Sequence, residues 1–404
     1  MSVPLDRLYN FLHDVCNHRD LIIYRFFPHG SRKLEDLTRL VKGHQSALPP
    51  INYQNGLLSK YVFYNDQEPL NFDLYKNVDV TQLPHIIMHT SGFESDHLKK
   101  YHAVAEKTMP YMNLKWAHGL SLCKYPTILV HSEKRSAELE RYEGIQFIGV
   151  YWWCHALIAQ DWFRYAKIDP ALNHKDIRHD FLIYNRAWSG TREYRIKFTE
   201  LVAENSLSDH CVSWFNEFDN DRHYLDHVFV NSKFASKNTQ LSQVFAASQA
   251  NSSSSADYTG IDYQTTAIEV VLETLFDDSR LHLTEKILRP IACGQPFMLA
   301  ATQGSLEYLR SYGFSTFNGL IDETYDTILD PLERLQAIVI EMKRIAQLSQ
   351  KDKHKLYTEL EKIASKNKQL FFSTEWQQKI IKEYECNFEL ALKKINTLLQ
   401  INSV

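Results

Sequence analysis

Residues 281–299 read LHLTEKILRPIACGQPFML, and this stretch carries the signals for a complete unit of strand, helix and strand. Thr284 is suited to cap the N-terminus of the helix, because its hydroxyl accepts a hydrogen bond from an unpaired amide of the first turn. Gly294 suits the left-handed position after a helix, and Pro296 prevents the helix from continuing. Phe297 begins an apolar run that we expect to be a buried strand.

The start of this predicted helix has the chemistry of a phosphate site. Free N–H groups and the positive end of the helix dipole meet there and attract anions. Lys286 adds a full positive charge, and Glu285 is able to accept hydrogen bonds from ribose hydroxyls. The residues therefore predict a site for a nucleoside diphosphate. The alternative is that these residues only cap the start of a solvent-exposed helix and bind no ligand.

Short apolar runs recur along the chain, and helical segments separate them. The first set of runs lies at residues 21–27, 61–64, 85–89, 127–130 and 147–150. The second set lies at residues 181–184, 212–215, 267–275 and 297–301. Strands that alternate with helices favour parallel sheets, so the sequence predicts an α/β fold.

The chain has 404 residues, which is more than one core usually supports. We expect an N-terminal Rossmann-like domain over residues 1–173 and a second over residues 174–330. Residues 331–404 predict a helical tail, because apolar residues recur at helical spacing. Five of them mark one face: Leu335, Ile338, Ile340, Met342 and Ile345. We expect the last helix to pack back on the N-terminal domain, with a partner-binding helix as the alternative.

The composition indicates a well-packed globular protein. Hydrophobic residues make up 44% of the chain, and the formal net charge is −4, which is acidic for a protein whose main role is to grip nucleic acid. The six cysteines show no paired spacing, which favours reduced thiols. No apolar run approaches the roughly 18 residues of a spanning helix, and the N-terminus lacks the pattern of a signal peptide. We expect a cytoplasmic protein without a membrane span.

A second cluster of polar residues follows the first strand of the second set. Asn185, Arg186 and Arg192 lie where an open α/β sheet places its ligand. Guanidinium groups match phosphate oxygens, so the two arginines are candidates to hold a diphosphate. The alternative is that Arg192, Glu193 and Arg195 form a solvated helix face with ion pairs.

Glu273 is a third polar group at the end of a predicted strand, and its apolar neighbours give a carboxylate there no obvious partner. Glu273, Thr284-Glu285-Lys286, Gly294 and Pro296 together resemble the C-terminal donor domain of fucosyltransferase-like glycosyltransferases. The segment from Asn185 to Arg192 is similar to the strand, loop and helix that carry an Arg near the pyrophosphate in that family. The likeness covers residues 181–326.

This resemblance implies a GT-B fold of two Rossmann-like domains with a central cleft, in which the second domain holds a nucleotide-diphospho-sugar. It implies these donor-binding residues: Asn185, Arg186, Arg192, Glu273, Thr284, Glu285 and Lys286. The helix sequence ILRPIAC and the surroundings of Glu273 depart from the full fucosyltransferase pattern, so the resemblance implies nucleotide-sugar binding without naming fucose. The whole chain looks closest to glycosyltransferase-like proteins of tailed phages and some bacteria, through residues 28–31, 66–70 and 131–134. A phage-encoded member would work in the host cytoplasm.

The first domain is expected to supply the acceptor site and the base that takes the proton of the acceptor hydroxyl. Asp66 and Glu68 follow a predicted strand and are the candidate catalytic residues, although Pro69 also suits a capped structural turn. Further candidates on the acceptor side are imidazoles and a carboxylate near predicted strand ends: His29, His131, Glu133 and His155.

No metal or resident cofactor is expected. Asp219-Asn220-Asp221 imitates the Asp-x-Asp motif of metal-dependent glycosyltransferases, but it lies in a charged loop that we interpret as surface. A helix dipole and basic side chains are able to neutralise the diphosphate in place of a metal.

The sequence thus predicts a metal-independent glycosyltransferase that moves a sugar from a nucleotide-diphospho-sugar to a hydroxyl. The acceptor is either a modified, hydroxymethylated base in phage DNA or a glycan or small molecule. A non-catalytic nucleotide-binding interaction protein is the alternative of a different class. A nucleotide-dependent oxidoreductase is disfavoured, because no Gly-x-Gly-x-x-Gly motif follows an early strand.

Overall fold

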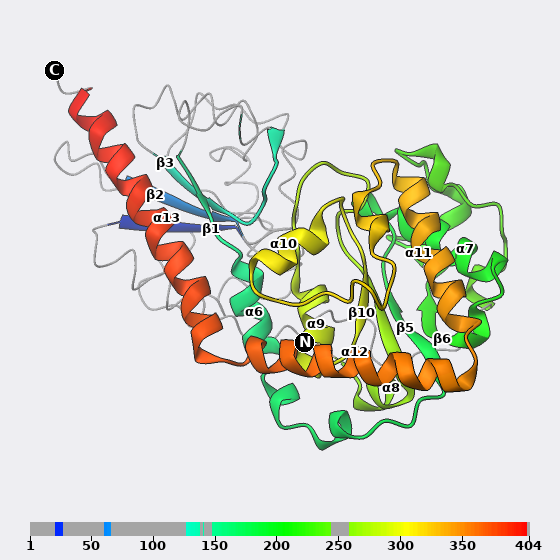
Figure 1. Ribbon diagram of the computed structural model, residues 1–404. Coiled ribbons are helices and arrows are strands. Elements are labelled where there is room, and N and C mark those ends of the chain that lie inside the picture. Colours follow the sequence, from blue (N-terminus) through cyan, green and yellow to red (C-terminus); the bar gives the residue numbers. More distant parts are fainter. Residues whose placement is uncertain are drawn as a thin grey trace, which may run out of the picture. The chain divides into compact units, whose positions relative to one another are not determined.

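A computed structural model of the protein describes residues 21–26, 60–65, 127–137, 140, 148–243 and 258–401 (Figure 1). The chain divides into two compact units, Met1–Leu157 with Gln378–Val404 and Ile158–Gln377. Each unit contains a parallel four-stranded sheet, which confirms the prediction of an α/β fold. The predicted strand at 85–89 lies outside the described residues.

The sheet of the first unit has the strand order β1-β2-β3-β4, and all neighbouring pairs are parallel. Its strands are β1 (Leu21–Phe26), β2 (Lys60–Asn65), β3 (Thr127–His131) and β4 (Ile148–Tyr151), each at a predicted position. Helix α13 (Thr374–Ile401) packs beside β4 within this unit. The indole Nε1 of Trp152 donates to the carbonyl of Ile380 at 2.9 Å, and its ring lies 4.7 Å from that of Tyr384.

The sheet of the second unit has the order β10-β9-β5-β6 and is also parallel. Its strands are β5 (His179–Asn185), β6 (Cys211–Phe215), β9 (Thr266–Leu272) and β10 (Phe297–Ala300). The chain runs from β5 to its neighbour β6 on one side, and then returns to place β9 on the other side of β5. The direction of the strand order therefore reverses between β5 and β9.

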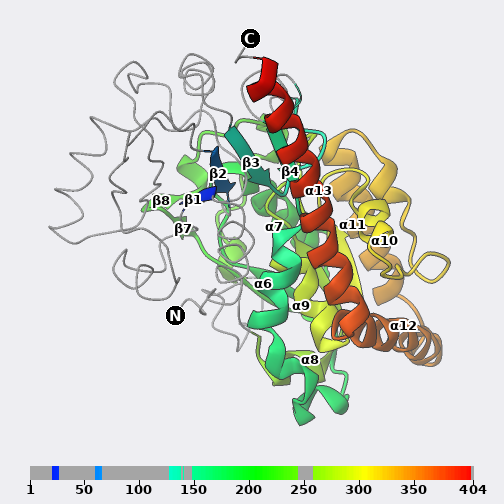
Figure 2. The ribbon, with the colours of Figure 1, turned by 90° about the vertical axis from the view of Figure 1, so that its left-hand side faces the viewer.

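Helices cover both faces of this second sheet. Helix α7 (Tyr194–Glu204) connects β5 to β6, and α9 (Glu285–Cys293) connects β9 to β10. Figure 1 shows α9 on one face of the sheet and α7 with α11 on the other, and Figure 2 looks onto the face that carries α9. Every residue of β9 is buried, which agrees with its mostly apolar sequence, interrupted by Thr266 and Glu269.

The remaining elements are mostly helical. The other α-helices among the described residues are α6 (Cys154–Trp162), α8 (Gly260–Thr265), α10 (Ser305–Ser311), α11 (Pro331–Ala346) and α12 (Gln350–Phe371). A small antiparallel hairpin pairs β7 (Phe218–Asp219) with β8 (Arg222–His223). The 3₁₀ turns are η4 (Arg164–Lys167), η5 (Pro170–Asn173), η6 (Gly190–Arg192), η7 (Ser208–His210), η8 (Tyr224–Asp226), η9 (Ser232–Phe234), η10 (Leu241–Gln243) and η11 (Thr324–Thr327). None of the described helices combines the length and the apolar character needed to cross a membrane.

Helix α9 begins and ends as its sequence predicts. The Thr284 hydroxyl accepts from the backbone N–H of Lys286 at 3.2 Å, which is the expected N-cap. Gly294 has φ 72°, the left-handed conformation that glycine adopts without strain, and its N–H donates to the carbonyl of Ile291 at 3.1 Å.

Two details of the sequence prediction are wrong. Ile340 is 64% exposed, whereas Leu335 and Ile338 are fully buried. Two residues along a helix turn by about 200°, so Ile340 lies on the face opposite Ile338. The predicted strand 267–275 ends at Leu272, where the strand paired with it, β10, ends at Ala300.

Candidate nucleotide-binding site

The predicted donor residues lie at the carboxyl ends of β5 and β9. The strand order reverses between these two strands, and ligands of open α/β sheets bind outside the carboxyl ends at such a point. The loop after β5 carries Arg186 and Arg192, and the loop after β9 leads to Lys286. The fold thus brings two segments about 80 to 100 residues apart to neighbouring strand ends.

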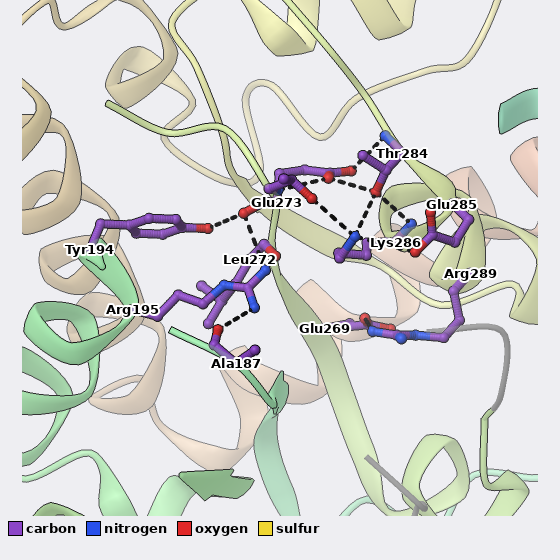
Figure 3. A network of polar contacts seen from close by, with 11 residues as sticks. Ala187, Tyr194, Arg195, Glu269, Leu272, Glu273, Thr284, Glu285, Lys286 and Arg289 are labelled. Carbon is purple, nitrogen blue, oxygen red and sulfur yellow. Dashed lines mark hydrogen bonds and ion pairs between the residues drawn. The ribbon is translucent and has the colours of Figure 1, made fainter. Parts of the chain in front are cut away.

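Glu273 closes the loop between β9 and α9. Its side chain is fully buried, and one carboxylate oxygen accepts from the backbone N–H of Thr284 at 3.1 Å. The other oxygen accepts from the Thr284 hydroxyl at 2.7 Å and from the N–H of Thr274 at 3.1 Å (Figure 3). These bonds compensate the cost of burying a carboxylate. Glu273 therefore organises the start of α9 from within, through the side-chain hydrogen bonds that it accepts from Thr274 and Thr284.

Lys286 lies at the centre of a compact polar group at this helix start. Its Nζ is 3.2 Å from the hydroxyl of Thr274, 3.1 Å from that of Thr284 and 3.2 Å from Oε1 of Glu285. The Lys286 side chain is 17% exposed, and that of Glu285 is 5% exposed. The ammonium is thus held by oxygen atoms at the N-terminus of α9 and retains access to solvent, as a cation that meets an anion requires.

The three polar residues after β5 have different surroundings. Asn185 is buried, and its Nδ2 donates to the hydroxyl of Thr199 at 2.9 Å, which directs the amide toward α7. Arg186 is exposed and Arg192 is partly buried. The two arginines remain candidates for phosphate contacts, while the structure gives Asn185 a role in attaching α7 to β5.

The alternative interpretation of a solvated helix face is wrong for two of its three residues, because Glu193 and Arg195 are buried. The Glu193 carboxylate accepts from the backbone N–H groups of Val230 at 2.9 Å and Asn231 at 2.7 Å, and it lies 3.2 Å from Nε2 of His227. Glu193 therefore anchors the segment that follows the β7–β8 hairpin to the start of α7.

Arg195 and Tyr194 are site residues that the sequence analysis did not select. The Arg195 guanidinium donates to the carbonyls of Ala187 at 2.7 Å, Leu272 at 2.5 Å and Glu273 at 3.2 Å (Figure 3). The Tyr194 hydroxyl donates to the same Glu273 carbonyl at 2.7 Å, and burial raises the pKa of Tyr194 to about 12. The signal in the sequence is weak: Arg195 shares a helix face with the buried residues Phe198, Thr199 and Val202.

Asp219 completes the loop after β5. The Asp-Asn-Asp motif lies in a hairpin at the surface, as interpreted, but one Asp219 oxygen accepts from the backbone N–H groups of Trp188 at 2.9 Å and Ser189 at 2.7 Å. Burial alone would raise the pKa of Asp219, but these hydrogen bonds and the charge of Arg192 lower it by more, so the net shift of the pKa is downward. A protein carboxylate thus occupies two amides of the loop that was expected to receive phosphate.

A buried ion pair lies below the site on the α9 face of the sheet. Nη2 of Arg289 is 2.6 Å from Oε1 of Glu269, and the Tyr263 hydroxyl donates to Oε2 of Glu269 at 2.5 Å. The Arg289 guanidinium also stacks over the ring of Tyr184 at 4.2 Å. Burial raises the pKa of Glu269, and the charge of Arg289 opposes that shift. The pair attaches α9 to β9 and so fixes the direction in which the helix start points.

Three of the acceptor-side candidates are described, and all three are buried near the carboxyl ends of β3 and β4. His131 ends β3 and Glu133 follows it, while His155 lies in the first turn of α6 after β4. The carbonyl of His131 accepts from the N–H of Trp152 at 2.8 Å, and Nδ1 of His155 lies 3.7 Å from Sγ of Cys154. The candidates Asp66, Glu68 and His29 lie outside the described residues.

Within the ranges that the structure describes, no group of three or more His, Cys, Asp or Glu side chains is placed to hold a metal ion. Comparison of the chain with models of known protein families and with curated proteins finds no match.

Proposed function

We propose that the protein is a GT-B-type glycosyltransferase whose second unit binds a nucleotide-diphospho-sugar. The observation that carries the proposal is the position of Lys286 at the N-terminus of α9, where side-chain oxygens of the loop and the first turn hold its ammonium. This position lies beside the strand-order reversal, next to the strand end whose loop carries Arg186 and Arg192. Helix N-termini with a nearby cation favour phosphate, and this part of an α/β sheet favours nucleotides.

In the proposed reaction, the acceptor hydroxyl attacks the anomeric carbon of the donor sugar. A bond forms between the acceptor oxygen and that carbon, and the bond from the carbon to the diphosphate oxygen breaks with its electron pair. Lys286, Arg186 and Arg192 stabilise the negative charge that develops on the leaving diphosphate. Glu285 binds the ribose. A base of the first unit takes the acceptor proton, for which Asp66 and Glu68 are the candidates.

The first test is a binding experiment. UDP, GDP and their sugars should raise the thermal unfolding temperature of the wild-type protein, because a ligand that binds only the folded state stabilises it by mass action. Lys286→Ala should lose most of that stabilisation. Lys351→Ala, which removes an exposed lysine at the start of α12, is the matched control and should keep it. Absence of stabilisation by every nucleoside diphosphate would remove the donor site from the proposal.

The second test separates the acceptors and the non-catalytic alternative. The purified protein is incubated with the donor that stabilises it, and with either DNA containing hydroxymethylated bases or glycan acceptors. Sugar transfer to DNA identifies a DNA-modifying enzyme, and transfer to a glycan identifies the second class. Nucleotide binding without transfer or hydrolysis on any acceptor would favour a nucleotide-binding interaction protein.

A further inference from the structure

Arg195 is a buried arginine that the proposed reaction does not use directly. Only 3% of its surface is exposed, and its two terminal nitrogens donate to three backbone carbonyls. Among the residues that the structure describes, Nε of Arg195 has no hydrogen-bond partner, and no carboxylate forms a salt bridge with the guanidinium. Burying a guanidinium, which stays charged, is costly, so this placement calls for a function.

The three carbonyls belong to both sides of the strand-order reversal. Ala187 lies in the loop after β5, whereas Leu272 ends β9 and Glu273 follows it. Figure 3 shows the guanidinium between these two strand ends. Arg195 therefore bridges the two adjacent loops on which the candidate phosphate ligands lie.

The bridge continues to the cation of the second loop. The carbonyl of Glu273 accepts from Arg195, and its carboxylate accepts from the amide and hydroxyl of Thr284. The Thr284 hydroxyl in turn contacts Nζ of Lys286 at 3.1 Å. A continuous series of contacts thus joins Ala187, in the arginine loop, to the Lys286 ammonium.

We propose that Arg195 is a positioning residue that sets the spacing between the arginine loop after β5 and the Lys286 helix start, and thereby the affinity for the diphosphate of the ligand. The proposal rests on the proposed function of this site. Arg195 acts through backbone carbonyls and does not itself contact the ligand. Its effect should therefore fall on the phosphate part of binding and leave the nucleoside part unchanged.

Arg334 provides a matched control. It is also buried, with 3% of its surface exposed, and its guanidinium also donates to three carbonyls, those of Phe276, Ile328 and Leu329. Arg334 lies at the start of α11, and its guanidinium contacts the loop between β9 and α9, through Phe276, but not the loop after β5. Loss of Arg334 should therefore cost stability in the same way and loosen only the second loop, without removing a contact that joins the two loops.

The experiment compares Arg195→Met, Arg195→Lys and Arg334→Met with the wild type. Affinities for UDP and uridine, or GDP and guanosine, are measured by calorimetry and ligand-observed NMR at a temperature where circular dichroism shows each variant folded. We expect Arg195→Met to lose about tenfold in diphosphate affinity, which is about 1.4 kcal/mol. Nucleoside affinity should stay within about twofold. Arg195→Lys, which keeps a charged donor, should reduce the loss to about threefold, and Arg334→Met should bind as the wild type does.

Equal losses for nucleoside and diphosphate in Arg195→Met would overturn the inference, and so would an equal loss in Arg334→Met. If Arg195→Met does not fold, Arg195→Lys and Arg334→Lys are compared, and only the former should show a selective loss of about threefold in diphosphate affinity.

Hydrogen exchange without ligand separates this inference from the proposed function. Arg195→Lys should speed exchange in both loops, residues 186–192 and 273–286, whereas Arg334→Met should leave the first loop unchanged. Unchanged exchange in either loop of Arg195→Lys would refute the bridge even if nucleotide binds. Faster exchange in both loops of Arg195→Lys, in a protein that binds no nucleotide, would support the bridge and reject the donor site.

Discussion

Replacing Thr284 by Val tests how strongly the start of α9 depends on one hydroxyl group. Valine keeps the shape of threonine but removes the hydroxyl that accepts from the N–H of Lys286 at 3.2 Å and donates to the carboxylate of Glu273 at 2.7 Å. The side chains of Thr284 and Glu273 are both fully buried, so water does not replace the lost bonds.

The hydroxyl also contacts Nζ of Lys286 at 3.1 Å, but that ammonium retains access to solvent, so the expected magnitude is the sum of two effects. Loss of an N-cap costs about 1 kcal/mol. Loss of a hydrogen bond to a buried carboxylate costs about 2 kcal/mol, because the charged acceptor remains in place. The free energy of unfolding should therefore fall by about 3 kcal/mol, which corresponds to a drop of roughly 6–12 °C in the unfolding temperature of a unit of this size.

The assay is urea and thermal unfolding followed by circular dichroism. Thr284→Ser, which restores the hydroxyl, should recover most of the stability. Thr358→Val is the control on an exposed helical position of α12 and should change the free energy of unfolding by less than about 0.5 kcal/mol. The reasoning would be refuted if Thr284→Val were as stable as Thr284→Ser.

Three further predictions concern charged residues of the second unit. Asp219→Asn should destabilise the protein at pH 7. Folding lowers the pKa of Asp219, so its contribution to stability is present above about pH 4 and is lost as the pH falls through the folded pKa. Urea unfolding should therefore show a smaller difference between the two proteins at pH 3 than at pH 7, and an equal difference would contradict this. Burial lowers the pKa of Lys175 to about 8, so the unfolded state binds more protons than the folded state between about pH 8 and 10.5. The free energy of unfolding of the wild type should therefore rise by about 3 kcal/mol over that range relative to Lys175→Met, and a pH-independent difference would contradict this. Asp180→Ala should lower the free energy of unfolding by about 3–5 kcal/mol, because it removes the carboxylate that lies 2.6 Å from the buried ammonium of Lys353 and leaves that ammonium without a counter-charge. Chemical denaturation measures the loss, and an effect no larger than that of Asp352→Ala, at an exposed position, would exclude the reasoning.

The strands and the ends of α9 could be predicted because their signals are local. Hydrophobic runs identify β5 and β9, and Thr284 and Gly294 each act on a neighbouring turn. The reversal of strand order could not be predicted, because no local sequence signal near β9 specifies the side of β5 on which it pairs.

The candidate site shows the same limit. Lys286 was identified from the helix start that carries it. Arg195 was missed and Glu193 was read as solvated, because their partners come from Glu273 and Val230, which are distant in the sequence. A buried charged residue differs from an exposed one only through such partners, and a single sequence does not contain their positions.

The contacts of Asp180 have a consequence for the order in which the chain folds. Its carboxylate accepts from Tyr357, which lies 177 residues later in the sequence, and from Lys353. Before α12 docks, the carboxylate at the amino end of β5 still lacks these two partners, and His210, 30 residues later in the sequence and 2.6 Å from Oδ2, is its nearby side-chain contact. Closing such long-range contacts is slow compared with forming local helices, so α12 should be among the last elements to settle during folding. A ribosome-bound chain that ends before α12 would remain open to chaperones and proteases at the amino edge of its central strand.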